Sequence, residues 1–230
     1  MLLAIDTSSL VLSCALAEPD RLVAEWTVQK KLTHSEQLIP HMDALLQEAG
    51  VSKQDITAVA CSVGPGSFTG LRIGLATAKT VARLWGAALV GVDTTEALAW
   101  NFAGAETFVL PLLDAQRGNV YAALYGAFGT FWQEAPLRVA PADEVIAAAV
   151  SHGGPVVACG EAADLYKEKL SAAGIRVAAP QNRMCRAGSV AAAAFAKLSR
   201  GETADPMTLS PNYVRRSEAE VLWEERHGKA

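Results

Sequence analysis

The chain has 230 residues, 51% of them hydrophobic, and its 20 basic and 24 acidic side chains give a formal net charge of −4. This composition excludes a disordered chain, a collagen-like fibre and a small disulfide scaffold, and the length suits one large domain or two small lobes. A mildly acidic chain is not expected to coat nucleic acid or an anionic membrane by itself.

No stretch approaches the ~20 apolar residues of a membrane span, and the N-terminal run meets Asp6 too early for a signal peptide. We therefore expect a cytoplasmic protein without membrane contact. The four cysteines lie far apart without a CxxC pair, which favours reduced cysteines in an apolar core. His34 and His41 are two helical turns apart, roughly 10 Å along an axis, and are not expected to share a metal ion. No metal site is predicted.

Apolar runs in the first half predict three strands of an antiparallel meander at residues 2–6, 11–17 and 22–28. A helix should follow, because Thr33 and Glu36 have the capping-box spacing and the next apolar side chains share one face up to Gly50. Pro40 lies inside this segment and conflicts with it. A buried strand at 58–63, a helix at about 70–85 and a strand at 88–92 complete this half.

The second half repeats this order with weaker patterns. Strands are predicted at 108–113, 120–125, 129–133, 156–159 and 175–178, and helices at 142–151, 162–173 and 189–200. The sequence therefore predicts an α/β fold with a duplicated βββαβα plan, and strands alternating with helices favour mostly parallel pairing. We place an N-terminal lobe at 1–103 and a C-terminal lobe at 104–230, whose tail could pack back on the first lobe.

The sequence GPGSFTGLRIG (64–74) lies between a predicted buried strand and a helix. Glycines allow a close backbone approach, and a helix N-terminus can hold an anion, but the P-loop lysine and the GxGxxG spacing are missing. Phosphate binding and a tight strand-to-helix turn both stay open. Within the helix, small residues recur every fourth position and could pack on the chain itself or on another molecule: Gly70, Gly74, Ala78 and Ala82.

Acidic residues end the first strand of each repeat, Asp6 in the first and Asp114 in the second. If the two repeats face one cleft, these carboxylates together with Ser8 are candidates for cofactor binding. A nucleotide phosphotransferase would use such carboxylates to hold Mg²⁺, but its first turn would contain glycine, which is absent after Asp6. Both residues could equally be turn caps that need no cofactor.

Six segments together closely resemble the TsaB family, also called YeaZ, over nearly the whole chain: AIDTSS (4–9), HSEQLIP (34–40), GPGSFTGLRIG (64–74), GVDTTEALA (91–99), LDAQRGNVY (113–121) and PNYVRR (211–216). The resemblance implies the two-lobed actin/Hsp70/sugar-kinase-like (ASKHA) fold with mixed sheets. It also implies a non-catalytic protein of tRNA threonylcarbamoyladenosine synthesis. The catalytic relative, TsaD, holds a metal with two histidines in a stretch N-H-M-E-G-H. Thr94 and Leu98 stand at those two positions here, so no catalytic residues are predicted.

Proteins of this family are expected to pair with TsaD through helices of the N-terminal lobe, to self-pair through the same surface, and to be joined by a TsaE-type ATPase. Carried onto this sequence, the interface residues are Ser35, Leu38, Met42, Leu45, Gly70, Gly74, Leu75, Ala78 and Ala82. We expect Gly74→Leu to block the pairing while the monomer stays folded. No cofactor is predicted, although a nucleotide at the junction with the catalytic partner stays open.

The net charge implies that tRNA is reached only through the complex, with the basic residues of the tail (Arg215, Arg216, Arg226 and Lys229) helping locally at most. The alternative is an enzyme of the same fold, either an ATP-dependent phosphotransferase or a glycoprotease-like peptidase. Asp6, Asp114 and the glycine-rich loop are its only support, because Ser67 has no histidine near it in sequence.

Overall fold

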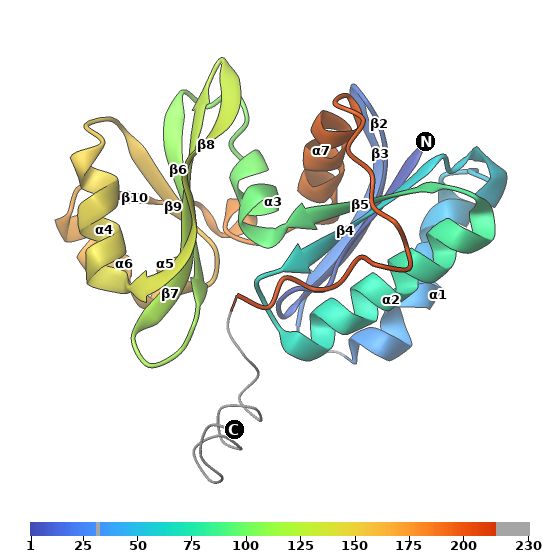
Figure 1. The fold of residues 1–230 in the computed structure, drawn as a ribbon, viewed down its shortest axis with the longest axis horizontal. Helices are drawn as coiled ribbons and strands as arrows, with labels where there is room; N and C mark the ends of the chain where they lie inside the picture. Colours follow the sequence, from blue (N-terminus) through green and yellow to red (C-terminus); the bar gives the residue numbers. More distant parts are fainter. Residues whose placement is uncertain (31–32, 215–230) are drawn as a thin grey trace, which may run out of the picture.

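The structure is a computed structural model that describes residues 1–30 and 33–214, and its two lobes lie side by side (Figure 1). The first lobe contains β1 (Leu2–Asp6), β2 (Val11–Glu18), β3 (Arg21–Gln29), α1 (His34–Glu48), a 3-10 turn (Lys53–Asp55), β4 (Ala58–Gly64), α2 (Phe68–Trp85) and β5 (Ala88–Asp93). Its sheet has the order β3-β2-β1-β4-β5. The first three strands are antiparallel, whereas β4 pairs in parallel with both β1 and β5.

The second lobe repeats this arrangement with β6 (Thr107–Asp114), β7 (Asn119–Phe128), β8 (Thr130–Pro141), α4 (Ala142–Ser151), β9 (Val156–Cys159), α5 (Ala162–Leu165), α6 (Lys167–Ala172) and β10 (Arg176–Val177). Its sheet order, β10-β9-β6-β7-β8, is that of the first sheet read backwards. Both sheets are mixed rather than mostly parallel, and the predicted duplicated βββαβα plan is confirmed.

The helices lie in three layers that alternate with the two sheets (Figure 1). α1 and α2 cover one face of the first sheet, and α4, α5 and α6 cover the outer face of the second. Between the sheets lie α3 (Thr94–Trp100) and α7 (Ala187–Leu198). Strand side chains alternate accordingly, so that Leu3 and Ile5 face α1 and α2 while Leu2 and Ala4 join the central core with α7.

The first helix confirms the predicted position but not the predicted cap. Thr33 is the N-cap residue of α1, but its side chain makes no capping hydrogen bond, so the capping box is absent. The helix runs through Pro40 because the side chains on either side, Leu38 and Met42, are buried against the sheet. Packing of this kind contributes more to helix stability than local propensity does. Gly50, with φ 63°, follows the end of the helix as predicted.

Three elements differ from the prediction. α3 was not predicted, because its seven residues are mostly buried and show no polar face. β8 is much longer than the predicted strand at 129–133. The sequence did not indicate this length, because the half-exposed strand contains Pro136 and its apolar and polar residues do not alternate clearly. The predicted helix 162–173 is two short helices that meet at Tyr166, which leaves helical geometry and packs on the outer core of the second lobe.

The last described part of the chain returns to the first lobe. α7 contributes to the central core next to β1 and β2, and residues 204–214, which we call the strap, then run along β5 and α2 (Figure 1). Among the hydrogen bonds that hold the strap are those from Ala204 N to Leu89 O (2.7 Å), from Lys79 Nζ to Leu209 O (3.0 Å) and from Asn212 N to Val63 O (2.6 Å).

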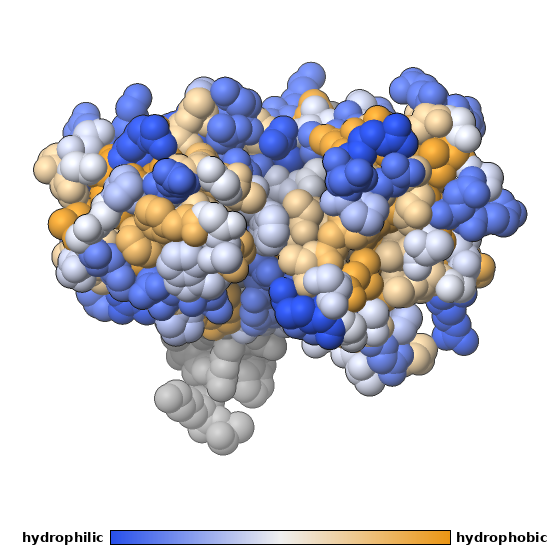
Figure 2. All heavy atoms as spheres, turned by 90° about the horizontal axis from the view of Figure 1, so that it is seen from above, coloured by the Kyte–Doolittle hydropathy of each residue, from blue (hydrophilic) through white to orange (hydrophobic). Residues whose placement is uncertain are grey.

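Seen from above, hydrophobic side chains form small patches that hydrophilic residues interrupt on both lobes (Figure 2). Over residues 1–30 and 33–214, none of the helices is long and apolar enough to cross a membrane. All four cysteines are buried and free, as the sequence predicts. Burial raises the pKa of the Cys14 and Cys61 thiols to about 12, so both remain protonated at neutral pH.

Candidate functional site between the lobes

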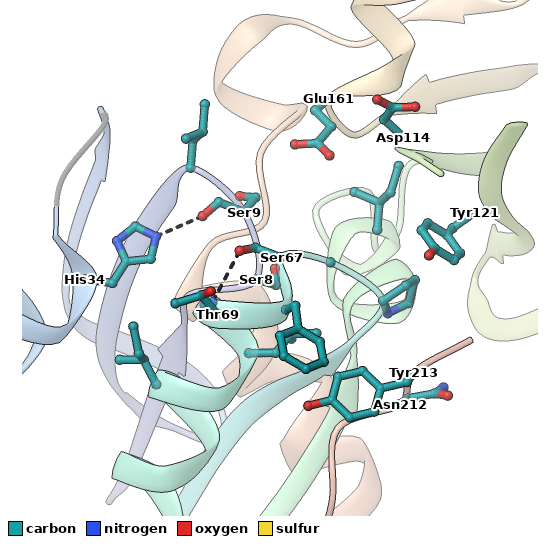
Figure 3. A pocket seen from close by; sticks show the side chains of 18 of the residues that line it. Ser8, Ser9, His34, Ser67, Thr69, Asp114, Tyr121, Glu161, Asn212 and Tyr213 are labelled. Carbon is teal, nitrogen blue, oxygen red and sulfur yellow. Dashed lines mark hydrogen bonds between the residues drawn. The ribbon is translucent and has the colours of Figure 1, made fainter. Parts of the chain in front are cut away.

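A pocket of about 770 Å³ opens between the lobes (Figure 3). The first lobe lines it with the β1–β2 turn, the start of α1 and the glycine-rich loop before α2. The second lobe contributes the end of β6, Tyr121 and Glu161, and the strap contributes residues 212–214. We call this space the interlobe pocket. It brings together segments from both ends of the chain, and it contains two of the three predicted cofactor candidates, Ser8 and Asp114.

The glycine-rich loop crosses directly over the β1–β2 turn. A β-carbon on Gly66 would lie 2.2 Å from Ser8 O, and one on Gly70 would lie 2.0 Å from Thr7 O. Two hydrogen bonds hold the contact, from Ser67 N to Ser8 O (2.7 Å) and from Thr7 Oγ1 to Gly70 O (2.7 Å). The glycines are therefore required for a close backbone approach within the chain, which favours the tight strand-to-helix turn over phosphate binding.

The small-residue stripe of α2 faces the inside of the same lobe. A β-carbon on Gly74 would lie 2.3 Å from Thr7 Oγ1, and Ala78 is fully buried. The stripe lets α2 approach β1 and its turn closely. The expectation that Gly74→Leu leaves the monomer folded is therefore wrong, because the leucine would overlap Thr7 before any partner could meet it.

Most of the residues predicted at a partner interface are buried in the chain itself. Ser35 alone of the set is exposed, and the other eight residues are buried: Leu38, Met42, Leu45, Gly70, Gly74, Leu75, Ala78 and Ala82. The outward faces of the same helices carry other residues, among them Ile39 and Ala44 on α1 and Ala76, Thr80 and Leu84 on α2. Periodicity located the helices correctly but selected their inward faces.

Asp6 is fully buried and does not line the interlobe pocket. Its Oδ1 accepts a hydrogen bond from Ser8 Oγ (2.8 Å), and Ser8 itself lines the pocket. Burial raises the pKa of Asp6 above its ordinary value, and hydrogen bonds from Ser62, Ser8 and Cys185 oppose part of that shift. Asp6 thus acts as a buried turn residue, which corrects the expectation that it faces an open cleft beside Asp114.

Asp114 does face the pocket, together with Glu161 from the turn after β9 (Figure 3). Asp114 Oδ1 accepts from Gln116 N (2.7 Å), so this carboxylate also shapes the β6–β7 turn. Desolvation by the surrounding protein raises the pKa of Glu161, a hydrogen bond from the Asp114 backbone lowers it, and the Asp114 charge raises it. Glu161 was missed from the sequence, although an acidic residue two positions after the buried strand 156–159 was a usable signal.

Ser67 and His34 line the same pocket but are engaged separately (Figure 3). Ser67 is the N-cap of α2, and its Oγ accepts from Gly70 N (3.2 Å). His34 Nε2 lies 2.9 Å from Ser9 O. Among the described residues, no serine hydroxyl is hydrogen-bonded to a histidine ring, so the geometry does not favour the nucleophile and base of a peptidase.

The stretch that resembles the metal-binding stretch of TsaD lies in α3. Thr94 and Leu98 are each 1% exposed in the centre of the molecule, and Glu96 is paired with Lys197 (3.2 Å). Burial raises the pKa of Glu96, and Lys197 lowers it in part. Within the part of the chain that the structure describes, no three His, Cys, Asp or Glu side chains come together in a metal-binding arrangement.

Known proteins with similar sequences and structures identify the family. The sequence model described as "TsaD: tRNA N6-adenosine threonylcarbamoyltransferase" matches residues 28–223. The chain is 32% identical over 227 residues to the tRNA threonylcarbamoyladenosine biosynthesis protein TsaB of Bacillus subtilis. The alignment covers 96% of this chain and 97% of that protein. YeaZ from Pseudomonas aeruginosa has a TM-score of 0.77 at 25% identity, with 92% of this chain and 98% of that chain covered.

A second Pseudomonas aeruginosa structure, described as an uncharacterized protein with similarity to peptidase YEAZ, has a TM-score of 0.79 at 26% identity. It covers 93% of this chain and 99% of that chain. The duplicated lobes thus define a two-lobed ASKHA-type protein related to the threonylcarbamoyltransferases. Within that class the chain belongs to the TsaB (YeaZ) family.

Proposed function

We propose that this chain is an accessory subunit of tRNA threonylcarbamoyladenosine synthesis. It pairs with a TsaD-type transferase, which modifies the adenosine 3′ of the anticodon in tRNAs that read codons beginning with A. The family membership and the name of the Bacillus subtilis relative support the pathway. The subunit itself performs no chemistry in this proposal.

The non-catalytic role is supported by the two positions where TsaD has metal-binding histidines. Leu98 cannot ligate a metal, and a lone threonine hydroxyl at Thr94 is a poor ligand. Both side chains are also buried in the central core, and Glu96 between them is paired with Lys197. These residues contribute to packing between the lobes.

The exposed residues on the outward face of α1 and α2 support the proposal that the first lobe binds the partner. Along α2 the outward positions Ala76, Thr80 and Leu84 recur every fourth residue, and Leu84 is 75% exposed. On the neighbouring helix, Ile39 is 52% exposed and Ala44 is exposed. Small side chains flanked by exposed apolar ones let a facing helix approach closely and bury apolar area. This face replaces the inward set selected from periodicity.

In the proposed assembly a TsaE-type ATPase joins the pair, and the free chain self-pairs through the same outward face. tRNA is held by the complex and not by this chain, in keeping with its net charge of −4. The basic tail residues Arg215, Arg216, Arg226 and Lys229 lie outside the described residues, and the four nearby glutamates offset their charge.

A binding experiment with one substitution on the outward face tests this proposal. Ala76→Arg places a long cation at the centre of the face, and we expect the affinity for the TsaD-type subunit to fall by at least about tenfold. Gel filtration and titration of the two subunits measure this, and a threonylcarbamoylation assay should show activity of the transferase only with this chain present. Ala147→Arg, at an exposed alanine of α4 in the second lobe, is the matched control. Full transferase activity without this chain would exclude the accessory role.

The alternative of an ATP-dependent phosphotransferase has one supporting observation, the Asp114 and Glu161 carboxylates in the interlobe pocket. The burial of Asp6, whose raised pKa disfavours the charged form, argues against a Mg²⁺ site built on both repeats. Calorimetric titration with ATP and Mg²⁺ separates the two functions, because micromolar binding with turnover would support only the phosphotransferase.

A further inference from the structure

Two exposed aromatic rings lie next to each other in the wall of the interlobe pocket. Phe68 is the first residue of α2 and Tyr213 belongs to the strap, and their ring centroids are 5.0 Å apart at an interplanar angle of 29°. Phe68 is 39% exposed and Tyr213 is 42% exposed, and both line the pocket. The close approach of the glycine-rich loop to the β1–β2 turn requires its glycines but does not require an exposed ring at position 68.

An arginine fixes the position of the two rings. The guanidinium carbon of Arg72 lies 3.9 Å from the centroid of the Phe68 ring, and Arg72 Nε donates a hydrogen bond to the Tyr213 phenol oxygen (2.9 Å). These contacts join α2 to the strap, which the bond from Asn212 N to Val63 O holds one residue earlier. An aromatic surface that is already held in place loses little conformational freedom when another flat molecule stacks on it.

The opposite wall of the pocket offers hydrogen-bond acceptors. Asp114 and Glu161 come from the second lobe and face the space across from Tyr213 (Figure 3), and Gln116 lines the pocket beside them. Of the described residues that line the pocket, none is a lysine or an arginine. A ligand that displaces water from this wall therefore has to bring N–H or O–H donors to the carboxylates.

Several kinds of ligand suit only one of the two walls. A phosphate chain would meet two carboxylates and neither lysine nor arginine in the lining. An arginine or lysine of a partner protein would pair with the carboxylates, but Arg72 already lies on the Phe68 ring and would repel a second cation there. An apolar side chain would leave both carboxylates without a donor. A neutral, flat nucleobase with an exocyclic amino group suits both walls, because its face stacks and its N–H groups donate.

We propose that the interlobe pocket binds an unpaired, amino-bearing nucleobase of single-stranded RNA. The base stacks on the Phe68–Tyr213 pair and donates its exocyclic N–H to Asp114 or Glu161. The choice of RNA over a free nucleoside rests on the proposed function, in which a tRNA is the substrate of the complex. The phosphates stay outside the lining, near the exposed Arg72. One stacked base adds to recognition without holding the polyanion, which agrees with the net charge of −4.

Binding of a labelled oligoriboadenylate to the full chain alone, followed by fluorescence anisotropy, tests the stacking. We expect Tyr213→Ala to weaken binding by about tenfold, as for the loss of one ring that stacks on a base. Tyr213→Phe keeps the ring and should bind within about threefold of the unaltered chain. The matched control is Phe128→Ala, which removes a 36% exposed ring of the second lobe that does not line the pocket, and it should leave the affinity unchanged.

The identity of the base tests the acidic wall. Adenine carries an exocyclic amino group and uracil does not, so the unaltered chain should bind oligoriboadenylate about fivefold more tightly than oligoribouridylate. In D114A/E161A this ratio of affinities should fall to about one. The control D143A/E144A removes the same charge from exposed positions of α4 and should leave the ratio unchanged.

Four results would overturn the proposal. They are no binding of oligoriboadenylate by the unaltered chain at millimolar concentration, equal affinities of the unaltered chain and Tyr213→Ala, and tighter binding of ATP than of adenosine. The fourth is a loss of affinity for the TsaD-type subunit in Tyr213→Ala with unchanged oligonucleotide binding, because the rings would then anchor a protein. These measurements use the isolated chain or its pairing, whereas the accessory role is tested by transferase activity, so the failure of one is distinguishable from the failure of the other.

Discussion

The two lobes place the same residue type at the same point of the fold and give it opposite surroundings. Asp6 ends β1 and Asp114 ends β6, and each strand is the centre of a five-stranded sheet. Asp6 is fully buried, with its pKa raised by burial, whereas Asp114 is exposed in the interlobe pocket. Duplicated topology therefore does not predict duplicated chemistry. The residues that surround the end of the strand decide whether its carboxyl group is buried or exposed.

Asp6 is surrounded by polar side chains that come from other parts of the chain: Ser62 on β4 and Cys185, which precedes α7, are hydrogen-bonded to it together with Ser8. The helix that follows the next parallel strand is a second difference between the lobes. In the first lobe an unbroken 18-residue helix follows the glycine-rich loop and lies on the β1–β2 turn. In the second lobe, Gly160 makes the equivalent close approach to Leu112 O, but the helix is short and breaks at Tyr166.

The largest effect is expected from filling the close contact between α2 and the β1–β2 turn. Gly74→Leu forces a side chain into Thr7, whose Oγ1 would lie 2.3 Å from the new β-carbon. We expect the free energy of unfolding to fall by about 3 kcal/mol or more, measured by urea denaturation. Ala76→Leu, two residues further on the exposed face, should change it by less than about 0.5 kcal/mol. A stable Gly74→Leu monomer would show that the stripe is not packed as described.

The next effect concerns the pH dependence of stability. Because the folded chain holds the Asp6 proton more tightly than the unfolded chain, its contribution to stability is full below about pH 4 and is lost as the pH rises through the raised pKa. Asp6→Asn should therefore flatten the decline of unfolding free energy above pH 4 and raise stability at pH 7. Chemical denaturation of the variant and of the unaltered chain at a series of pH values measures this. Equal slopes for the two proteins would contradict the buried state of Asp6.

A smaller effect is expected at the caps of the equivalent helices. Ser67 Oγ accepts from Gly70 N at the start of α2, whereas Glu161 makes no side-chain capping bond at the start of α5. Ser67→Ala should lower the free energy of unfolding by about 1 kcal/mol. Glu161→Ala should cost no more than a few tenths of a kcal/mol. If both substitutions had the same cost, the contrast between the two helix starts would be wrong.

The smallest effect is expected at the end of the strap. Tyr213→Phe removes the phenol oxygen that accepts from Arg72 Nε and keeps the ring on Phe68. Because the pair is exposed, the expected loss is about 0.5 kcal/mol. A double-mutant cycle with Arg72→Gln measures the coupling. No coupling between the two residues would mean that ring stacking alone holds this part of the strap.

The sequence predicted the elements correctly where the spacing of hydrophobic residues and the positions of turn residues indicated the same boundaries. The helix at 142–151 and the strand at 156–159 have the predicted bounds, and the glycine-rich loop joins a buried strand to a helix as expected. Prediction failed where tertiary packing overrides local pattern. The short α3 is buried from both sides, and β8 is a half-exposed edge strand, so neither shows a clear period.

The candidate site was predicted less well, for a physical reason. Helical spacing shows that Leu38, Met42 and Gly74 share a face with their neighbours, but it does not show whether that face meets the chain's own sheet or another molecule. Only the 2.3 Å approach to Thr7 settles this for Gly74. The same limit applies to Asp6 and Asp114, whose identical positions in the two repeats gave no indication of which one is covered.

The position of α7 has a consequence for the order in which this protein is made. Leu2, Ala4 and Ala60 on the first sheet join their core with a helix that begins only at Ala187. At a synthesis rate of about 5–20 residues per second, roughly 10–40 s pass between the appearance of β1 and that of α7. During this interval one face of the first sheet lacks its cover. The first lobe is therefore expected to complete its folding only after nearly the whole chain has left the ribosome.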